Sequence, residues 1–164
     1  MKDEINRWIE KVKNIKNEAD LSKDEDLAIA IMNLISLEEH FYFTAIKTNN
    51  QKYLEMLDSI RGLRTKLMKK IVTNPKGEEW CVSKHLLASS MRLIEVGTKA
   101  YKTDKNEANS YFEAAFELFS LFFAINLKIV DKEEIKTISN PSSQALSSKF
   151  SEIMKKILDC CKEL

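Results

Sequence analysis

Apolar residues recur every three to four positions along almost the whole chain. Side chains at this spacing lie on one face of an α-helix, so the pattern predicts helices rather than strands. The breaks between the periodic runs contain residues that start or stop helices. The predicted helices span about residues 3–18, 22–48, 51–72, 78–102, 104–130 and 144–163. The polar stretch 131–143 between the last two is predicted to be a linker.

The residues at the helix ends support these boundaries. Ser22 and Glu25 have the spacing of a capping box, and Asp104 is suited to cap the helix that follows it. Asn49 and Asn50 are turn formers between two long apolar runs. Each of these positions indicates a short connection between long helices.

The composition agrees with a helical fold. Only 3 Gly and 2 Pro are present, fewer than sheets built from hairpins usually require, while 44% hydrophobic residues are enough for one core. Four long helices joined by short turns are typical of an up-down-up-down four-helix bundle. We therefore predict an all-α, single-domain protein over residues 1–164, in which amphipathic N- and C-terminal helices accompany this bundle.

Charge and cysteine content narrow the possible environments. A formal net charge of +1 provides no general attraction for nucleic acid or anionic membranes. The charged N-terminus lacks a secretory signal, and no apolar run is long enough to span a bilayer. The three cysteines are an odd number and include an adjacent pair, which does not indicate a disulfide framework. These features predict a soluble cytoplasmic protein.

The helix predicted at 78–102 has two different sides. Ser83, Ser90 and Gly97 lie within its apolar arc, where small residues let a neighbouring helix approach closely. Cys81 and His85 lie one turn apart on the opposite, polar side. That side has the composition of a solvated surface, although Cys81 and His85 could also supply two zinc ligands. A structural zinc site normally has four ligands, and no second pair has this spacing.

A carboxylate lies in an apolar place in the helix predicted at 22–48. Glu38 falls well inside the apolar arc, and Arg64 falls near the middle of the arc of the next helix. Counting outward from the turn near Asn50 places Glu38 level with Arg64, and Glu39 level with Arg61. Because a buried carboxylate requires a partner, Glu38 and Arg64 are predicted to pair.

This layer has two interpretations. It is either a buried ion pair that sets the register of the helices, or part of a polar pocket for the carboxylate or phosphate of a small ligand. The candidate ligand-binding residues are Glu38, Glu39, Tyr42, Arg61, Arg64, His85, Ser89 and Arg92. A separate polar residue, Asn126, lies within an arc of phenylalanines and is predicted to bond a neighbouring side chain.

Several functions find no support in the sequence. Neither His40 nor His85 follows a Glu by three residues, as the ligands of di-iron bundles do, and no glycine-rich phosphate loop is present. No cofactor is predicted.

The function that the sequence favours is a non-catalytic interaction or assembly module. Its terminal amphipathic helices would join another copy or a protein partner. One alternative is a small-molecule or metal-binding bundle, with or without enzymatic activity, centred on Glu38 and Arg64. A second is RNA binding through a local lysine cluster, formed by Lys66, Lys69, Lys70, Lys76 and Lys84.

Overall fold

The structure, a computed structural model, describes residues 2–18, 21–130 and 155. The fold is all-helical, as predicted, and the described residues contain no strand. Its helices are α1 (Lys2–Glu18), α2 (Ser22–Thr48), α3 (Lys52–Ile71), α4 (Glu79–Ala100) and α5 (Lys105–Asn126). The predicted linker at 131–143 and the predicted helix at 144–163 lie outside the described residues.

The turns between the helices follow the predicted chemistry. Asn49 ends α2 in the left-handed conformation with a φ of 50°, which asparagine tolerates better than most residues. Gly77 has a φ of 57° in the connection between α3 and α4. Asp104 caps α5 by accepting hydrogen bonds from the backbone N–H groups of Asn106 and Glu107, at 2.9 and 3.0 Å.

The predicted start of α2 is confirmed, and the predicted end of α5 is wrong. Ser22 is the first residue of α2, at the predicted boundary, although Leu21 rather than Ser22 occupies the N-cap position. Helix α5 ends at Asn126 rather than near residue 130. The chain turns there, and Lys11 Nζ of α1 donates to the carbonyl oxygens of Lys128 and Ile129, at 3.1 and 2.9 Å. Those carbonyls thus bond a side chain from a distant helix.

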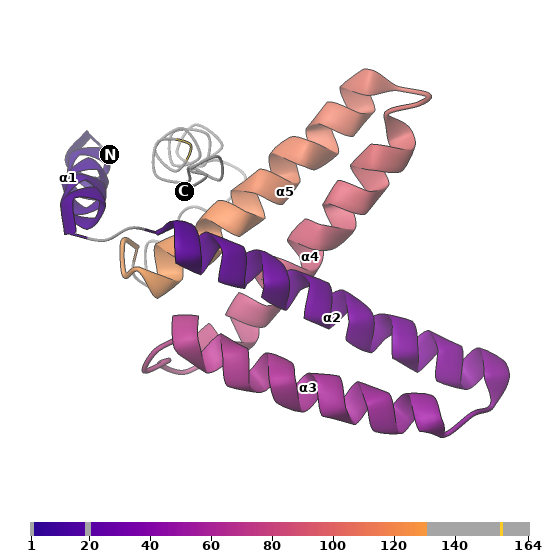
Figure 1. The fold of residues 1–164 in the computed structure, drawn as a ribbon. Helices are drawn as coiled ribbons and strands as arrows, with labels where there is room; N and C mark the ends of the chain where they lie inside the picture. The colour runs from indigo at the N-terminus through magenta and orange to yellow at the C-terminus, as the bar shows by residue number, and fades with distance from the viewer. Residues whose placement is uncertain (1, 19–20, 131–154, 156–164) are drawn as a thin grey trace.

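The helices form two antiparallel hairpins, one of α2 and α3 and the other of α4 and α5. Figure 1 shows that the hairpins come together where α2 passes across α4, and that their far ends point in different directions. The up-down-up-down four-helix bundle is therefore not confirmed. The residues of α4 buried most deeply, including Ser83, Leu87 and Ser90, lie on the side that meets α5, and α2 covers only part of another side.

Close contact between α4 and α5 depends on small residues, as predicted. Gly97 leaves so little room that a Cβ atom there would lie 2.6 Å from a ring carbon of Phe112. The Ser90 hydroxyl donates to the carbonyl oxygen of Ala115 at 2.8 Å. Asn126 donates to the hydroxyl oxygen of Ser83 at 3.0 Å, which confirms its predicted partner on a neighbouring helix.

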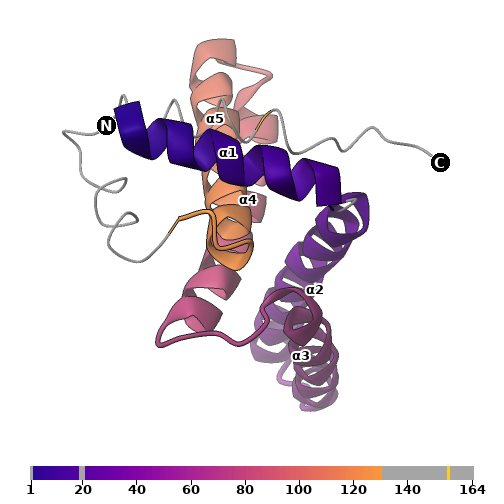
Figure 2. The same ribbon diagram turned by 90° about the vertical axis from the view of Figure 1, so that its left-hand side faces the viewer.

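One hydrophobic cluster contains buried residues from all five described helices. Helix α1 contributes Trp8 and Val12, and Figure 2 shows it crossing in front of α5. The inner half of α2, nearest α4, contributes Ala28, Met32 and Ile35. None of the described helices is both long and apolar enough to cross a membrane.

Candidate functional site

The carboxylate of Glu38 binds two arginines of α3. Arg64 donates to it through Nε at 2.7 Å and through Nη2 at 3.3 Å, one bond to each oxygen. Glu38 and Arg64 are both buried, which confirms the predicted pair. This fork of two bonds matches the geometry of a carboxylate and compensates its charge inside the fold.

The second arginine binds differently. Arg61 donates to Glu38 Oε2 through Nε at 3.2 Å, and 57% of its side chain is exposed, compared with 7% for Arg64. Helix register had placed Arg61 level with Glu39. In the structure both arginines of α3 turn to Glu38, because Glu38 faces α3 while Glu39 lies toward α4.

Glu39 pairs with an arginine from the other hairpin. Arg92 of α4 lies 3.3 Å from Glu39 Oε2 through its Nε, and its Nη2 donates to the hydroxyl of Ser36. These contacts join α2 to α4 near the point where the hairpins diverge. Arg92 was a candidate residue in the sequence, whereas nothing in the sequence distinguished Ser36.

A small pocket lies beside Glu38, where α2, α3 and α4 meet. Its volume is about 290 Å³. We call it the Glu38 pocket; it is lined by Ile35, Glu38, Glu39, Tyr42, Leu57, Arg61, Lys84, His85 and Ala88. The structure thus brings Tyr42 and His85 to the predicted layer and adds Lys84. The candidate Ser89 does not line this pocket, because α4 crosses α2 at an angle and only the residues at the crossing reach it.

The described residues offer no third ligand beside Cys81 and His85 for a metal ion. Cys81 and His85 are both exposed on α4. Within residues 2–18, 21–130 and 155, no group of three or more His, Cys, Asp or Glu side chains is arranged to hold a metal ion. Cys81 is a free thiol.

The lysine cluster near the α3–α4 connection is divided between two places. Lys69 lines an open pocket of about 610 Å³ together with Pro75 and Trp80. Lys84 lines the Glu38 pocket instead. Binding of RNA through these lysines stays a prediction.

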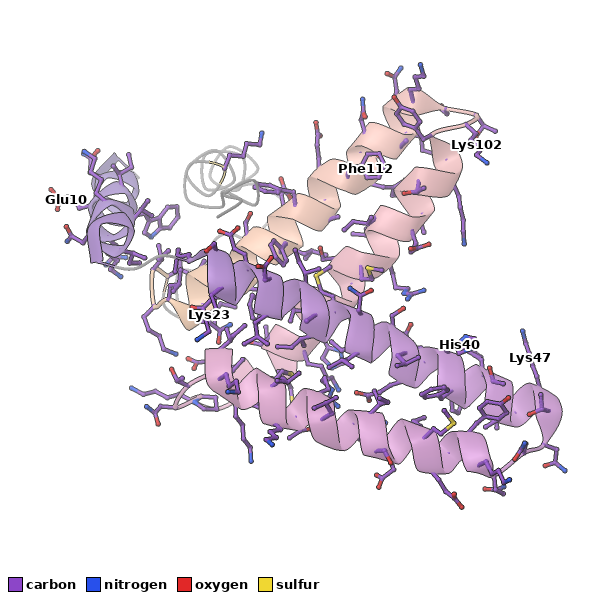
Figure 3. The ribbon with its side chains drawn as sticks, viewed as in Figure 1. Glu10, Lys23, His40, Lys47, Lys102 and Phe112 are labelled. Atoms are coloured by element: carbon purple, nitrogen blue, oxygen red, sulfur yellow. The ribbon has the colours of Figure 1, made fainter. Side chains whose placement is uncertain are left out.

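An apolar surface on the outer half of the α2–α3 hairpin was not anticipated from the sequence. Its residues are Tyr42, Phe43, Ile46 and Leu54, which we call the outer face, and all are exposed. Ile46 lies one helical turn beyond Tyr42, and Leu54 one turn from Leu57, so both continue the side that borders the Glu38 pocket. Figure 3 labels His40 and Lys47 on the same half of α2, and both side chains point away from α3.

No protein family model matches the chain, and neither the curated proteins nor the solved structures contain a significant match to it. The function must therefore be argued from the chain's own residues.

Proposed function

We propose that this chain is a non-catalytic interaction and assembly module, and that it pairs with a second copy of itself through the outer face. The observation that carries the proposal is the exposure of three neighbouring apolar side chains of α2. Tyr42, Phe43 and Ile46 are 49%, 58% and 66% exposed. A contiguous apolar patch of this kind on a small protein is typical of an interaction site.

The outer face continues a surface that the fold already buries. Ala28, Met32 and Ile35 on the inner half of α2 belong to the core, and the same side of the helix then runs on past the crossing with α4. Tyr42 and Ile46 repeat this apolar pattern about two and three turns beyond Ile35. Helix α2 thus has the sequence of a helix covered along its whole length, while the residues that the structure describes cover only the first part.

The charges beside the outer face favour a second copy as the partner. Lys47 follows Phe43 by one turn, which gives the edge of α2 a positive charge. Glu55 and Asp58 lie beside Leu54 and give the edge of α3 a negative charge. The α2 edge of one copy therefore attracts the α3 edge of another.

The energy of this contact indicates a reversible dimer. Each large apolar side chain that becomes fully buried contributes about 1.5–3 kcal/mol. The outer faces of two copies contain eight such side chains, each already partly buried, and their burial must offset an association cost of about 4–15 kcal/mol. The two contributions are similar in size, so we expect pairing that depends on protein concentration.

Such a dimer also accounts for the four-helix pattern that the sequence predicted within one chain. Contact between the outer halves of two α2–α3 hairpins brings four helices together, contributed by two chains instead of one. The interaction surface that we propose is accordingly the hairpin rather than the N-terminal helix. Trp8 and Val12 of α1 are buried in the core of their own chain, which supports this choice.

We also propose that the protein works in the cytoplasm. The exposed free thiol of Cys81 suits a reducing compartment, and so does the odd number of cysteines.

Replacing Ile46 with Glu tests the proposed surface. A charge at the centre of the outer face cannot be buried without a partner, so the Ile46→Glu chain should dimerise at least about tenfold more weakly than the unmodified chain. Sedimentation velocity over a range of protein concentrations measures this change. Because Ile46 is largely exposed in the single chain, the Ile46→Glu variant should keep the helical circular dichroism of the unmodified chain.

Leu63→Glu is the matched control. Leu63 is also exposed on the hairpin, but it lies nine residues from Leu54, half a turn round α3, and therefore on the opposite side. This variant should dimerise like the unmodified chain. A chain that stays monomeric at every concentration would overturn the proposal, as would equal weakening by both substitutions.

A further inference from the structure

The Glu38 pocket has the size and the walls of a binding site for a small molecule. Its volume of about 290 Å³ is close to the lower limit for ligand pockets, about 300 Å³. Three helices from both hairpins line it, and apolar walls come from Ile35, Leu57 and Ala88. The remaining wall is polar and charged, which is the combination that small-molecule sites require.

The charges of the pocket do not cancel. Arg64 already compensates Glu38 with two bonds, so the contact of Arg61 at 3.2 Å places a second cation on the same carboxylate. Glu39, the other acid of the pocket, is paired with Arg92. Lys84 forms no ion pair among the residues that the structure describes. Arg61 and Lys84 therefore supply positive charge in excess of the acids nearby.

The donor groups of Arg61 also remain accessible. Its bond to Glu38 uses Nε, while 57% of the side chain faces solvent. A guanidinium group offers further N–H donors on its two Nη atoms, in a planar fork that matches carboxylate and phosphate. The bond from Nε fixes the base of the fork, which reduces the entropy lost when a ligand binds.

We infer that the Glu38 pocket binds a small molecule consisting of a carboxylate or phosphate group attached to an apolar body. The Nη atoms of Arg61 and the ammonium group of Lys84 hold the anionic group, and a ring N–H of His85 is a third donor from the same wall. The apolar body lies against Ile35, Leu57 and Ala88. Glu38, which Arg64 fixes inside the fold, holds Arg61 in position.

Titration of the full-length chain with three probes tests this inference. Phenyl phosphate and benzoate each combine an anionic group with an apolar ring, while inorganic phosphate has no apolar part. We expect saturable binding of phenyl phosphate or benzoate, whichever anion the pocket prefers, and weaker binding of inorganic phosphate. Backbone amide shifts in ¹⁵N spectra should change at Lys84, His85 and Ala88. If neither aromatic probe saturates these shifts, the inference is wrong.

A pair of charge-matched variants separates the pocket from general attraction. Arg61→Gln should weaken binding of the preferred probe by about tenfold or more, because it removes a charge-assisted fork. Lys66→Gln removes the same charge from an exposed position on α3 outside the pocket, and binding should change by less than about twofold, because exposed charges beyond the site are screened by salt. Equal effects of the two substitutions would overturn the inference.

Arg61→Gln should leave the fold intact, so that a loss of binding can be assigned to the pocket. Arg61→Gln retains both bonds between Arg64 and Glu38, so the thermal midpoint should be unchanged within about 2 °C. Lys84→Gln, on a different helix, provides a second route and should weaken binding in the same direction. Full affinity in Lys84→Gln and Arg61→Gln alike would contradict the proposed contacts.

Discussion

The carboxylate of Glu38 lies where α2, α3 and α4 come together, and its pairing with Arg64 was predictable from the sequence. A helical wheel placed both residues in apolar arcs, and distance from the turn placed them at one height. The same reasoning failed for Arg61 and Glu39, since heights within one hairpin do not reveal how a second hairpin crosses it. Arg92 reaches Glu39 only because α4 passes α2 at that point.

Removing Arg64 should destabilise the fold strongly. Arg64→Met leaves the buried carboxylate with Arg61 alone, which is largely exposed and forms one bond to it. We expect the free energy of unfolding to fall by about 3 kcal/mol, the lower end of the range for breaking a buried ion pair. Urea denaturation measures the loss.

The double variant Glu38→Met with Arg64→Met is the control for this expectation. Because both charges are gone and the volume is approximately kept, most of the lost stability should return. If the double variant is as unstable as Arg64→Met, burial of an unpaired charge is not the cause.

At the scale of elements, the sequence predicted most of the helices and one interface well. Helical spacing and turn residues located α2 to α4 to within two residues, and the small residues of α4 predicted its close contact with α5. The end of α5 was missed, because the apolar pattern of Leu127, Ile129 and Val130 continues although the helix does not. Those residues form a turn in which they are partly or fully buried, and Lys11 of α1 bonds the carbonyl oxygen of Ile129. Local periodicity cannot show such a contact with a distant helix.

Two glycines should respond to alanine in opposite ways. In Gly97→Ala the added methyl group would lie 2.6 Å from the ring of Phe112 and 3.2 Å from the carbonyl oxygen of Ala108, so α4 and α5 must separate or the ring must move. Overpacking of this kind costs about 1–3 kcal/mol, which exceeds the gain in helix propensity. We expect a lower free energy of unfolding in urea.

Gly62→Ala is the matched substitution in α3. No atom lies within 4 Å of the position that the new Cβ would take. The variant should gain about 0.5–1 kcal/mol, because alanine favours the helix and restricts the unfolded chain. The same sign of change at both positions would contradict the close contact at Gly97.

For the whole molecule, the helical class was predictable and the arrangement of the hairpins was not. Apolar periodicity shows that a helix face will be covered, but it does not say which surface covers it. Apolar residues of α2 such as Phe43 and Ile46 suit the interior of a four-helix bundle, and the sequence predicted such a bundle within one chain. In the structure the hairpins diverge and leave these residues exposed. The surface that we propose for assembly follows from this difference.

Hydroxyl-radical footprinting of the unmodified protein at low and high concentration measures the covering of that surface most directly. The rate at which each side chain is oxidised reports its exposure. If a second copy covers the outer face, Phe43, Ile46 and Leu54 become less reactive as concentration rises, while Leu63 on the opposite side of α3 reacts equally throughout. Reactivity of Phe43 and Ile46 that is the same at all concentrations would contradict assembly through the outer face.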